Sequence, residues 1–204
     1  MRLSQSDITY FRKDEKHEGF TLKCSPRKEG CTFTALSEVA KTLNHNGIDT
    51  EIFQAGNPDT DNVKAAAAKL KEDRCAYSWF SGILASPSGQ IIEFMDKLCS
   101  MAGKDMLHKP AAAVASARRA GTTATLDVLQ KYFSYHEMPV VSANYWNMVH
   151  GNTPAEVAQD EEGLQIMRSL GNNMAWLLKS LEAGKAAGIA VPQAEDKIKT
   201  NFIR

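Results

Sequence analysis

The chain has 204 residues, and its 24 basic and 24 acidic side chains give a formal net charge of zero. This length suffices for one domain with a sizeable core, and the neutral balance argues against a nucleic-acid-binding protein. No apolar run approaches the roughly 20 residues that span a membrane.

The polar first 18 residues are predicted to be an N-terminal extension, followed by one domain over residues 19–204. The extension has no apolar segment of the kind found in secretory signals, so we expect a cytoplasmic protein. The cysteines at 24, 31, 75 and 99 form no CxxC pair. This spacing favours free thiols over a zinc or iron–sulfur site.

Short apolar runs alternate with longer helical patterns along the rest of the chain. Strands are predicted at 19–23, 48–53, 75–80, 111–116 and 138–146. Helices are predicted where apolar residues recur at helical spacing; these are residues 33–43, 63–70, 86–98, 122–134 and 164–181. Ser86 and Pro87 are expected to open the third helix as its cap and first residue. Residues 153–156, Thr-Pro-Ala-Glu, form a predicted capping box.

The regular alternation of strands and helices predicts an α/β fold with a parallel sheet covered on both faces. Right-handed crossovers leave few topologies, and five strands fit a three-layer, doubly wound, flavodoxin-like sheet of order 2-1-3-4-5. Ligands bind such sheets beyond the carboxyl ends of the strands. The loops at 24–32, 81–88 and 116–122 are therefore the candidate site.

The first of these loops reads CSPRKEGCT, residues 24–32. Ser25 and Thr32 supply hydroxyl groups, Arg27 supplies a forked cation, and a helix begins directly afterwards. A helix start with such side chains can bind phosphate, but an ordinary capped turn has the same composition. The two cysteines are either reactive thiols near a helix start or small filling residues.

The segment SPRKEGCT, followed by an amphipathic helix, resembles the GSPRxxGNT phosphate loop of NAD(P)H-dependent FMN reductases in the flavodoxin-like superfamily. The resemblance continues through ASPSGQIIEFMDKL, HKPAAAVASARRAGTTATLDVLQKYF, MPVVSANYWNMVHG and the closing TNFIR. It implies a bound FMN.

The resemblance also assigns residues to the parts of FMN. The phosphate would be held by Ser25, Arg27, Cys31 and Thr32, and the ring would pass along Ser81, Gly82, Ile83 and Leu84. Its pyrimidine edge would meet Ser116, Ala117, Arg118, Arg119, Gly121 and Thr122. No side chain is expected to act as a catalytic acid or nucleophile, because the cofactor carries the hydride chemistry.

Several positions depart from the family pattern. Cys24 stands where the family usually has Gly, Cys31 where it usually has Asn, and residues 81–84 lack the usual aromatic side chain. AGNPDTDN follows the second strand where some relatives carry a cysteine-rich segment, which argues against an iron–sulfur flavoprotein.

The resemblance implies an oxidoreductase that transfers hydride from NAD(P)H through FMN to a small acceptor such as a quinone or a flavin. The alternatives are an FMN-binding electron-transfer module without NAD(P)H turnover, or a scaffold that has lost FMN. We expect a homodimer or homotetramer, with no nucleic-acid or membrane partner and no metal. Arg118 and Arg119 fit the flavin, a nucleotide phosphate or a subunit contact, and residues 144–147 are expected after the last strand, at the pocket or an interface.

Overall fold

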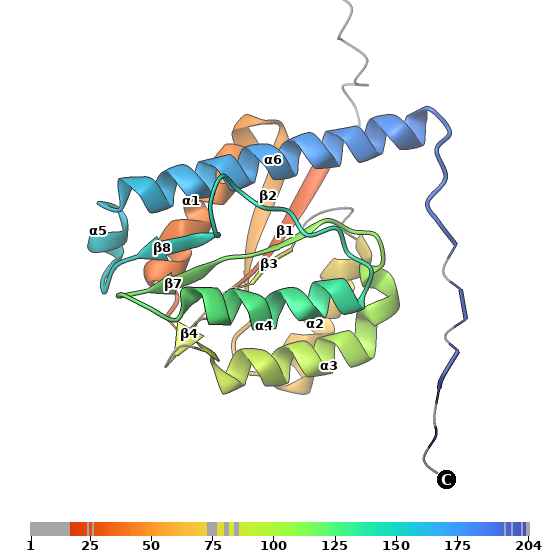
Figure 1. Cartoon of the computed structure of the whole chain (residues 1–204), viewed down its shortest axis with the longest axis horizontal. Coiled ribbons are helices and arrows are strands. Elements are labelled where there is room, and N and C mark those ends of the chain that lie inside the picture. The colour runs from red at the N-terminus through yellow and green to blue at the C-terminus, as the bar shows by residue number, and fades with distance from the viewer. Residues whose placement is uncertain are drawn as a thin grey trace, which may run out of the picture.

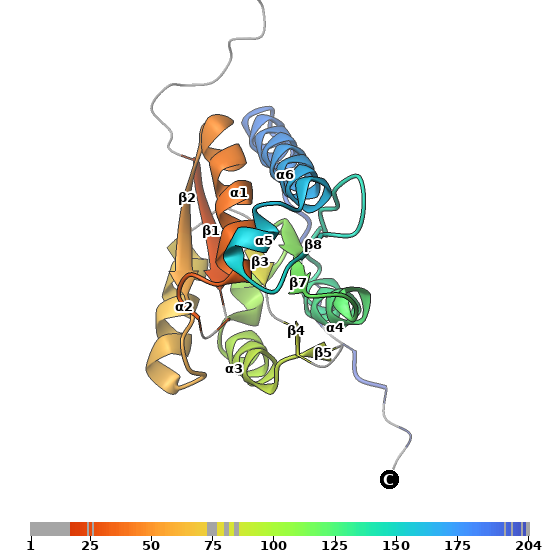
Figure 2. The ribbon, with the colours of Figure 1, turned by 90° about the vertical axis from the view of Figure 1, so that its left-hand side faces the viewer.

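The protein is described by a computed structural model that covers residues 17–23, 25, 27–72, 77–79, 82–83, 86–193, 195–196, 198–200 and 202. Strands lie in the middle layer, with helices on both faces (Figures 1 and 2). The predicted α/β class is therefore confirmed.

Strand β1 (His17–Lys23) pairs in parallel with β2 (Ile48–Gln54), and Lys23 lies opposite Gln54 at the carboxyl ends. The strand begins at His17, two residues inside the predicted extension, because its ladder with β2 already starts there. Phe20 and Leu22 are fully buried, and Thr21 and Lys23 are almost so. This strand therefore lies inside the sheet although its sequence is only moderately apolar.

The remaining ladders are short. Strand β3 (Tyr77–Trp79) pairs in parallel with β6 (Ala111–Ala113), and β7 (Ala115–Ala117) pairs in parallel with β8 (Met148–His150). Strand β1 lies beside β3, and β4 (Gly82–Ile83) forms a small antiparallel ladder with β5 (Ser86–Pro87). A continuous five-stranded sheet of order 2-1-3-4-5 stays a prediction.

Two apolar clusters bury the two faces of the strands. Helices α2 (Thr60–Glu72), α3 (Gly89–Met106) and α4 (Thr122–Tyr135) contribute to one cluster. Helices α1 (Cys31–His45) and α6 (Glu161–Ala186), with the short α5 (Pro154–Val157), contribute to the other. No helix in the described ranges combines the length and apolarity needed to cross a bilayer.

Helix α3 begins two residues later than expected. Ser88, not Ser86, is its cap and accepts a hydrogen bond from the Ile91 N–H at 3.4 Å, while Ser86 and Pro87 form β5. The predicted cap was wrong because the serines at 86 and 88 have equal capping chemistry. Ser88 stands three residues before Ile91, where the buried face of the helix starts.

The predicted strand at 138–146 was also wrong for most of its length. Val140 alone forms a parallel bridge, with Ala111, and the regular strand β8 starts only at Met148. Tyr145 and Trp146 are 52% and 57% exposed, with their rings edge to face at 4.7 Å. They precede the last strand instead of following it.

The side chain of Asn147 supports this irregular segment. Its amide oxygen accepts a hydrogen bond from the Ala143 N–H at 3.2 Å, and its amide nitrogen donates to the Ala113 carbonyl at 3.0 Å. The Ala115 N–H donates to the Asn147 carbonyl at 2.9 Å. A buried side chain thus makes bonds that a strand backbone would otherwise supply, which an apolar β-pattern cannot reveal.

The capping box predicted at 153–156 is confirmed in its Thr153 half, while the Glu156 carboxylate accepts from the Asn152 N–H at 2.7 Å, one residue before the cap. Thr153 is the N-cap of α5 and accepts from the Glu156 N–H at 3.2 Å. Asp160 caps α6 and accepts from two backbone N–H groups, that of Gly163 at 2.9 Å and that of His150 at 2.6 Å. One carboxylate therefore ties the end of β8 to the start of the longest helix.

Candidate functional site

Two of the predicted loops meet through their hydroxyl groups. The side-chain oxygens of Thr32, in the first turn of α1, and Ser116, in β7, lie 3.1 Å apart. Thr32 is 4% exposed, whereas Ser116 is half-buried. The contact spans 84 positions of sequence and brings together the start of α1 and the end of β7, both at the carboxyl edge of the strands.

The start of α1 lacks a side-chain cap. Its N-cap is Gly30, which has extended backbone and provides no side-chain cap. The first N–H groups of a helix have no partner within the helix, and together with the helix dipole they favour an anion. Arg27 and Lys28 are exposed beside this turn, Cys31 is half-buried, and Ser25 is buried. These are donors and cations suited to a phosphate.

The segment before α1 rests on a buried lysine. The Lys23 ammonium donates to the Ser25 carbonyl at 3.1 Å, the Arg27 carbonyl at 2.5 Å and the Gln54 side-chain oxygen at 2.6 Å. Gln54 also donates to the Ser25 carbonyl at 2.7 Å. A lysine at the end of the predicted strand 19–23 is the sequence feature that points to this contact.

The loop after β7 turns at a glycine with left-handed backbone. Gly121 has a φ of 91° and is the N-cap of α4, a conformation that side chains other than glycine adopt at a cost. Arg118 and Arg119 are exposed, and Ser116 and Ala117 are half-buried. The Thr122 hydroxyl donates to the Met148 sulfur at 3.2 Å, so this side chain points into the core.

The loop between β3 and α3 contributes the small β4–β5 ladder. Gly82 and Ile83 form β4, which lies near β7. Its other predicted residues, Ser81 and Leu84, lie outside the described residues, as does Cys24. The described part therefore places the second loop beside the third.

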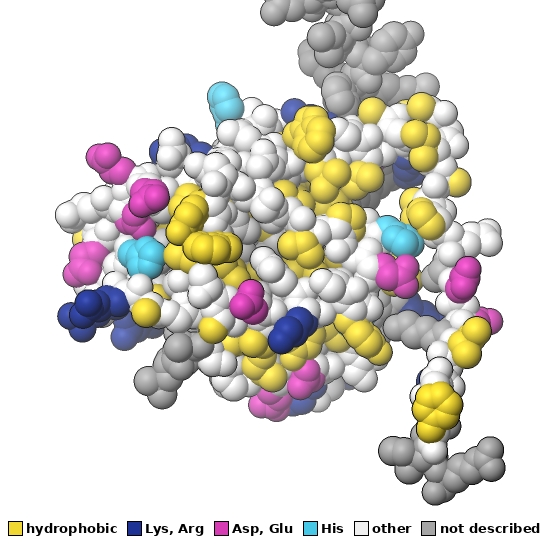
Figure 3. All heavy atoms as spheres, in the orientation of Figure 1, with side chains coloured by type: hydrophobic (Ala, Val, Ile, Leu, Met, Phe, Trp, Pro, Cys, Tyr) yellow, Lys and Arg dark blue, Asp and Glu magenta, His cyan; other side chains and the backbone are white. Residues whose placement is uncertain are grey.

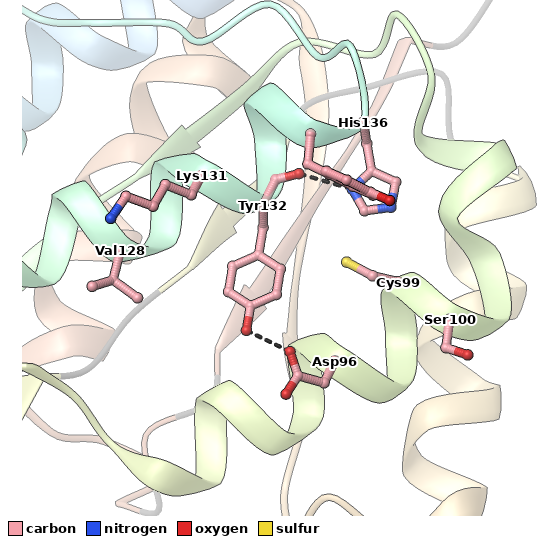
Figure 4. A pocket seen from close by; sticks show the side chains of 8 residues that line it. Asp96, Cys99, Ser100, Val128, Lys131, Tyr132 and His136 are labelled. Atoms are coloured by element: carbon pink, nitrogen blue, oxygen red, sulfur yellow. Dashed lines mark hydrogen bonds between the residues drawn. The ribbon is translucent and has the colours of Figure 1, made fainter. Parts of the chain in front are cut away.

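A separate cavity of about 620 Å³ lies between α3 and α4 (Figure 4). The Tyr132 hydroxyl donates to the Asp96 carboxylate at 2.6 Å across it, and the His136 ring bonds the Tyr132 carbonyl at 2.8 Å. Burial, with a contribution from Asp96, raises the pKa of the Cys99 thiol to about 12. The apolar pattern in the sequence indicates only which sides of α3 and α4 face the core, so it did not predict this cavity.

No group of three or more His, Cys, Asp or Glu side chains within the described ranges is placed to hold a metal ion. Cys31 and Cys99 are free thiols, and Cys24 and Cys75 fall outside those ranges.

The fold and the loop geometry define an α/β protein of the flavodoxin-like class. A WrbA-like flavodoxin from Agrobacterium tumefaciens superposes with a TM-score of 0.64 and 16% identity, covering 81% of this chain and 99% of that one. The flavoenzyme NAD(P)H:acceptor oxidoreductase FerB from Paracoccus denitrificans superposes with a TM-score of 0.62 and 12% identity, covering 80% and 98%. These structures share the fold.

Similarity in sequence points to flavoproteins within this fold class. Residues 83–153 match the family described as NADPH-dependent FMN reductase, a segment that includes part of the second loop and all of the third. An iron–sulfur flavoprotein of Methanocaldococcus jannaschii is 25% identical over 184 residues, which are 78% of this chain and 95% of that protein. The resemblance to NAD(P)H-dependent FMN reductases within the flavodoxin-like superfamily is therefore confirmed.

The described residues fit FMN. The uncapped start of α1, next to Arg27, has the donors that a phosphate needs, and the Thr32–Ser116 contact joins it to β7. The left-handed Gly121 turns the backbone beside that edge, where peptide groups can meet a flavin ring. The family match and the flavoprotein relative support FMN as the ligand.

Proposed function

We propose that the protein is an FMN-dependent oxidoreductase that uses NAD(P)H to reduce a small acceptor, such as a quinone or a flavin. The observation that carries this proposal is the 3.1 Å contact of Thr32 with Ser116, which joins a phosphate-type helix start to the loop that matches the reductase family. The predicted sheet order 2-1-3-4-5 and a cytoplasmic location are part of the proposal.

The residues divide into two groups by role. Ser25, Arg27, Cys31 and Thr32 would hold the phosphate with the first N–H groups of α1. Residues 81–84 and 116–119, with Gly121 and Thr122, would border the ring. Bound FMN would supply the hydride chemistry, so the protein contributes position and charge.

Exposed cations near the third loop suit the second substrate. Arg118 and Arg119 both face solvent beside the left-handed turn at Gly121. A guanidinium fork binds phosphate in a bidentate manner. These two side chains are therefore the candidates for the phosphate groups of NAD(P)H or for the pyrimidine edge of FMN.

We also propose a homodimer or homotetramer. Large hydrophobic side chains are exposed on the segment before β8 (Val140, Tyr145 and Trp146) and on α6, where Trp176 is 70% exposed. The Asn173 amide donates to the Ser142 carbonyl at 2.8 Å, so the two elements are in contact. Hydrophobic side chains gather over these elements in Figure 3. Light scattering during gel filtration should give a multiple of 22.4 kDa, and Trp176→Glu should lower it.

A single experiment separates the proposal from its alternatives. The purified protein is loaded with FMN, its visible spectrum is recorded, and NADPH is added without oxygen. We expect a yellow protein whose visible flavin absorbance is lost when NADPH is added. The absorbance should return when a quinone is added. Bound FMN that NADPH leaves yellow would favour an electron-transfer module, and a protein that cannot be loaded with FMN would favour a scaffold without cofactor.

A further inference from the structure

The last residue of β1 places an ammonium group beneath the loop that leads into α1. Lys23 is 1% exposed, and it donates hydrogen bonds to the carbonyls of Ser25 and Arg27 and to the side chain of Gln54. Burying an ammonium group is costly unless its donors are satisfied. The register places Gln54 directly opposite Lys23 at the end of β2, which provides one of the acceptors.

These bonds fix the direction of two carbonyl groups, those of Ser25 and Arg27. In a planar trans peptide the carbonyl and the next N–H point in opposite directions. Because the Arg27 carbonyl points inward to Lys23, the N–H of Lys28 points away from it, toward the side on which a ligand could lie. The Ser25 carbonyl is held inward twice, by Lys23 and by Gln54. Because these two carbonyls point inward, their negative partial charges lie away from an anion bound on the outer side.

We propose that Lys23 is a positioning residue for the phosphate of FMN. It holds the carbonyls of Ser25 and Arg27 on the inner side of the loop that leads to the start of α1. This inference rests on the proposed FMN site. It goes further by assigning to Lys23 and Gln54 the preference for FMN over riboflavin, which has the same ring and no phosphate.

The test compares FMN and riboflavin binding to the full chain by quenching of flavin fluorescence. Lys23→Met should weaken FMN binding at least tenfold and change riboflavin binding less than twofold. Lys41→Met is the matched control, because the Lys41 side chain is 77% exposed on α1 and pairs only across the surface with Glu38. It should leave both affinities unchanged.

Gln54→Leu tests the same arrangement from β2 and keeps the proposal falsifiable if Lys23→Met does not fold. It should weaken FMN binding about threefold to tenfold, with riboflavin unchanged, because one of the two bonds to the Ser25 carbonyl is lost. Circular dichroism melting confirms that each variant is folded.

The outcomes separate the inference from the proposed function. If the natural protein binds FMN better than riboflavin and both variants keep that ratio, Lys23 has no role in the phosphate site and the inference is wrong. An equal loss of FMN and riboflavin would also overturn it. If the natural protein binds neither flavin, the FMN function fails and the inference fails with it.

Discussion

The hydroxyl oxygens of Thr32 and Ser116 lie 3.1 Å apart, although 84 positions separate them in the sequence. One belongs to the first turn of α1 and the other to β7. If FMN lies along this surface, its phosphate and its ring are positioned by two loops that are held in register by this contact.

Ser116→Ala is expected to weaken FMN binding about fivefold, since one hydrogen bond contributes about 1 kcal/mol and about 1.4 kcal/mol is tenfold in affinity. Thr32→Val should have a similar effect, and the double variant should lose less than the sum because both changes remove the same contact. Fluorescence titration gives the three affinities. Ser134→Ala is the control, because that exposed hydroxyl bonds only within α4. Unchanged affinity in both single variants would contradict the site.

Two glycines of α6 should respond to alanine in opposite directions. A Cβ at Gly171 would lie 2.7 Å from the Thr42 Cβ and 3.2 Å from the Val39 carbonyl oxygen, so α1 would have to move. At Gly184 the nearest atom, on Ile189, is 3.5 Å away. Gly171→Ala should lower the free energy of unfolding by about 1–3 kcal/mol through overpacking. Gly184→Ala should raise it by about 0.5–1 kcal/mol through helix propensity.

Urea denaturation monitored by circular dichroism measures both changes. The pair is informative because both glycines lie in the same helix and the substitution is identical. A loss of stability of equal size in both variants would mean that α6 does not pack closely on α1 at Gly171.

The cap at Asp160 should matter for stability. Its carboxylate accepts from the N–H groups of Gly163 and His150. Asp160→Ala is expected to lower the free energy of unfolding by about 1–2 kcal/mol, the usual range for the loss of an N-cap. Asp160→Asn should lose less than Asp160→Ala but still be less stable than the natural protein, because its single amide oxygen can accept from only one of these two N–H groups, which bond different carboxylate oxygens. Thermal melting compares the variants, and full stability of Asp160→Asn would contradict the two-bond cap.

The thiol between α3 and α4 should be unreactive. Burial and Asp96 raise the pKa of Cys99 to about 12, so about one thiol in ten thousand is ionised at pH 8. We expect iodoacetamide to leave Cys99 unmodified in the folded protein and to label it rapidly in urea, as read by peptide mass spectrometry. Fast labelling of the folded protein would show that the cavity beside Tyr132 opens readily.

The same pKa predicts how stability depends on pH. Because the thiol is harder to ionise in the folded protein, its contribution is complete below the ordinary thiol pKa of about 9 and is lost as pH rises toward 12. The free energy of unfolding should therefore fall over this window. Cys99→Ala should remove part of the fall, while leaving the part due to Tyr132, whose pKa is also raised by burial and Asp96.

Iron analysis offers a further check. The Methanocaldococcus jannaschii relative is named an iron–sulfur flavoprotein. In the present chain AGNPDTDN, without cysteine, follows the second strand. We expect elemental analysis of protein purified without oxygen to give less than about 0.1 iron per chain, against the several irons of a cluster. Stoichiometric iron with sulfide would contradict this prediction.

The order of the elements could be predicted because it depends on local patterns. The stripe that includes Leu36 and Leu43 marks α1, and the alanine-rich run 111–116 marks the consecutive strands β6 and β7. The start of α3 could not be placed, since Ser86 and Ser88 cap equally well and the choice depends on the β4–β5 ladder.

The candidate site was predictable in its loops and not in its supporting contacts. A helix start after SPRKEG predicts an anion site from sequence, because the donors are backbone groups of the helix itself. The contact of Lys23 with Gln54 depends on the register of two strands, and the contact of Thr32 with Ser116 depends on the packing of two distant loops. Such relationships require the folded chain.

The amide of Asn147 has a consequence for how this protein can change over time. Because that single side chain bonds the Ala143 N–H and the Ala113 carbonyl, residues 144–146 are released from the hydrogen-bonding requirements of the sheet. Tyr145 and Trp146 can then be exchanged, or a residue inserted between them, with little cost to folding. The stretch can diversify its contacts while the strands beneath it stay the same, provided that Asn147 is kept.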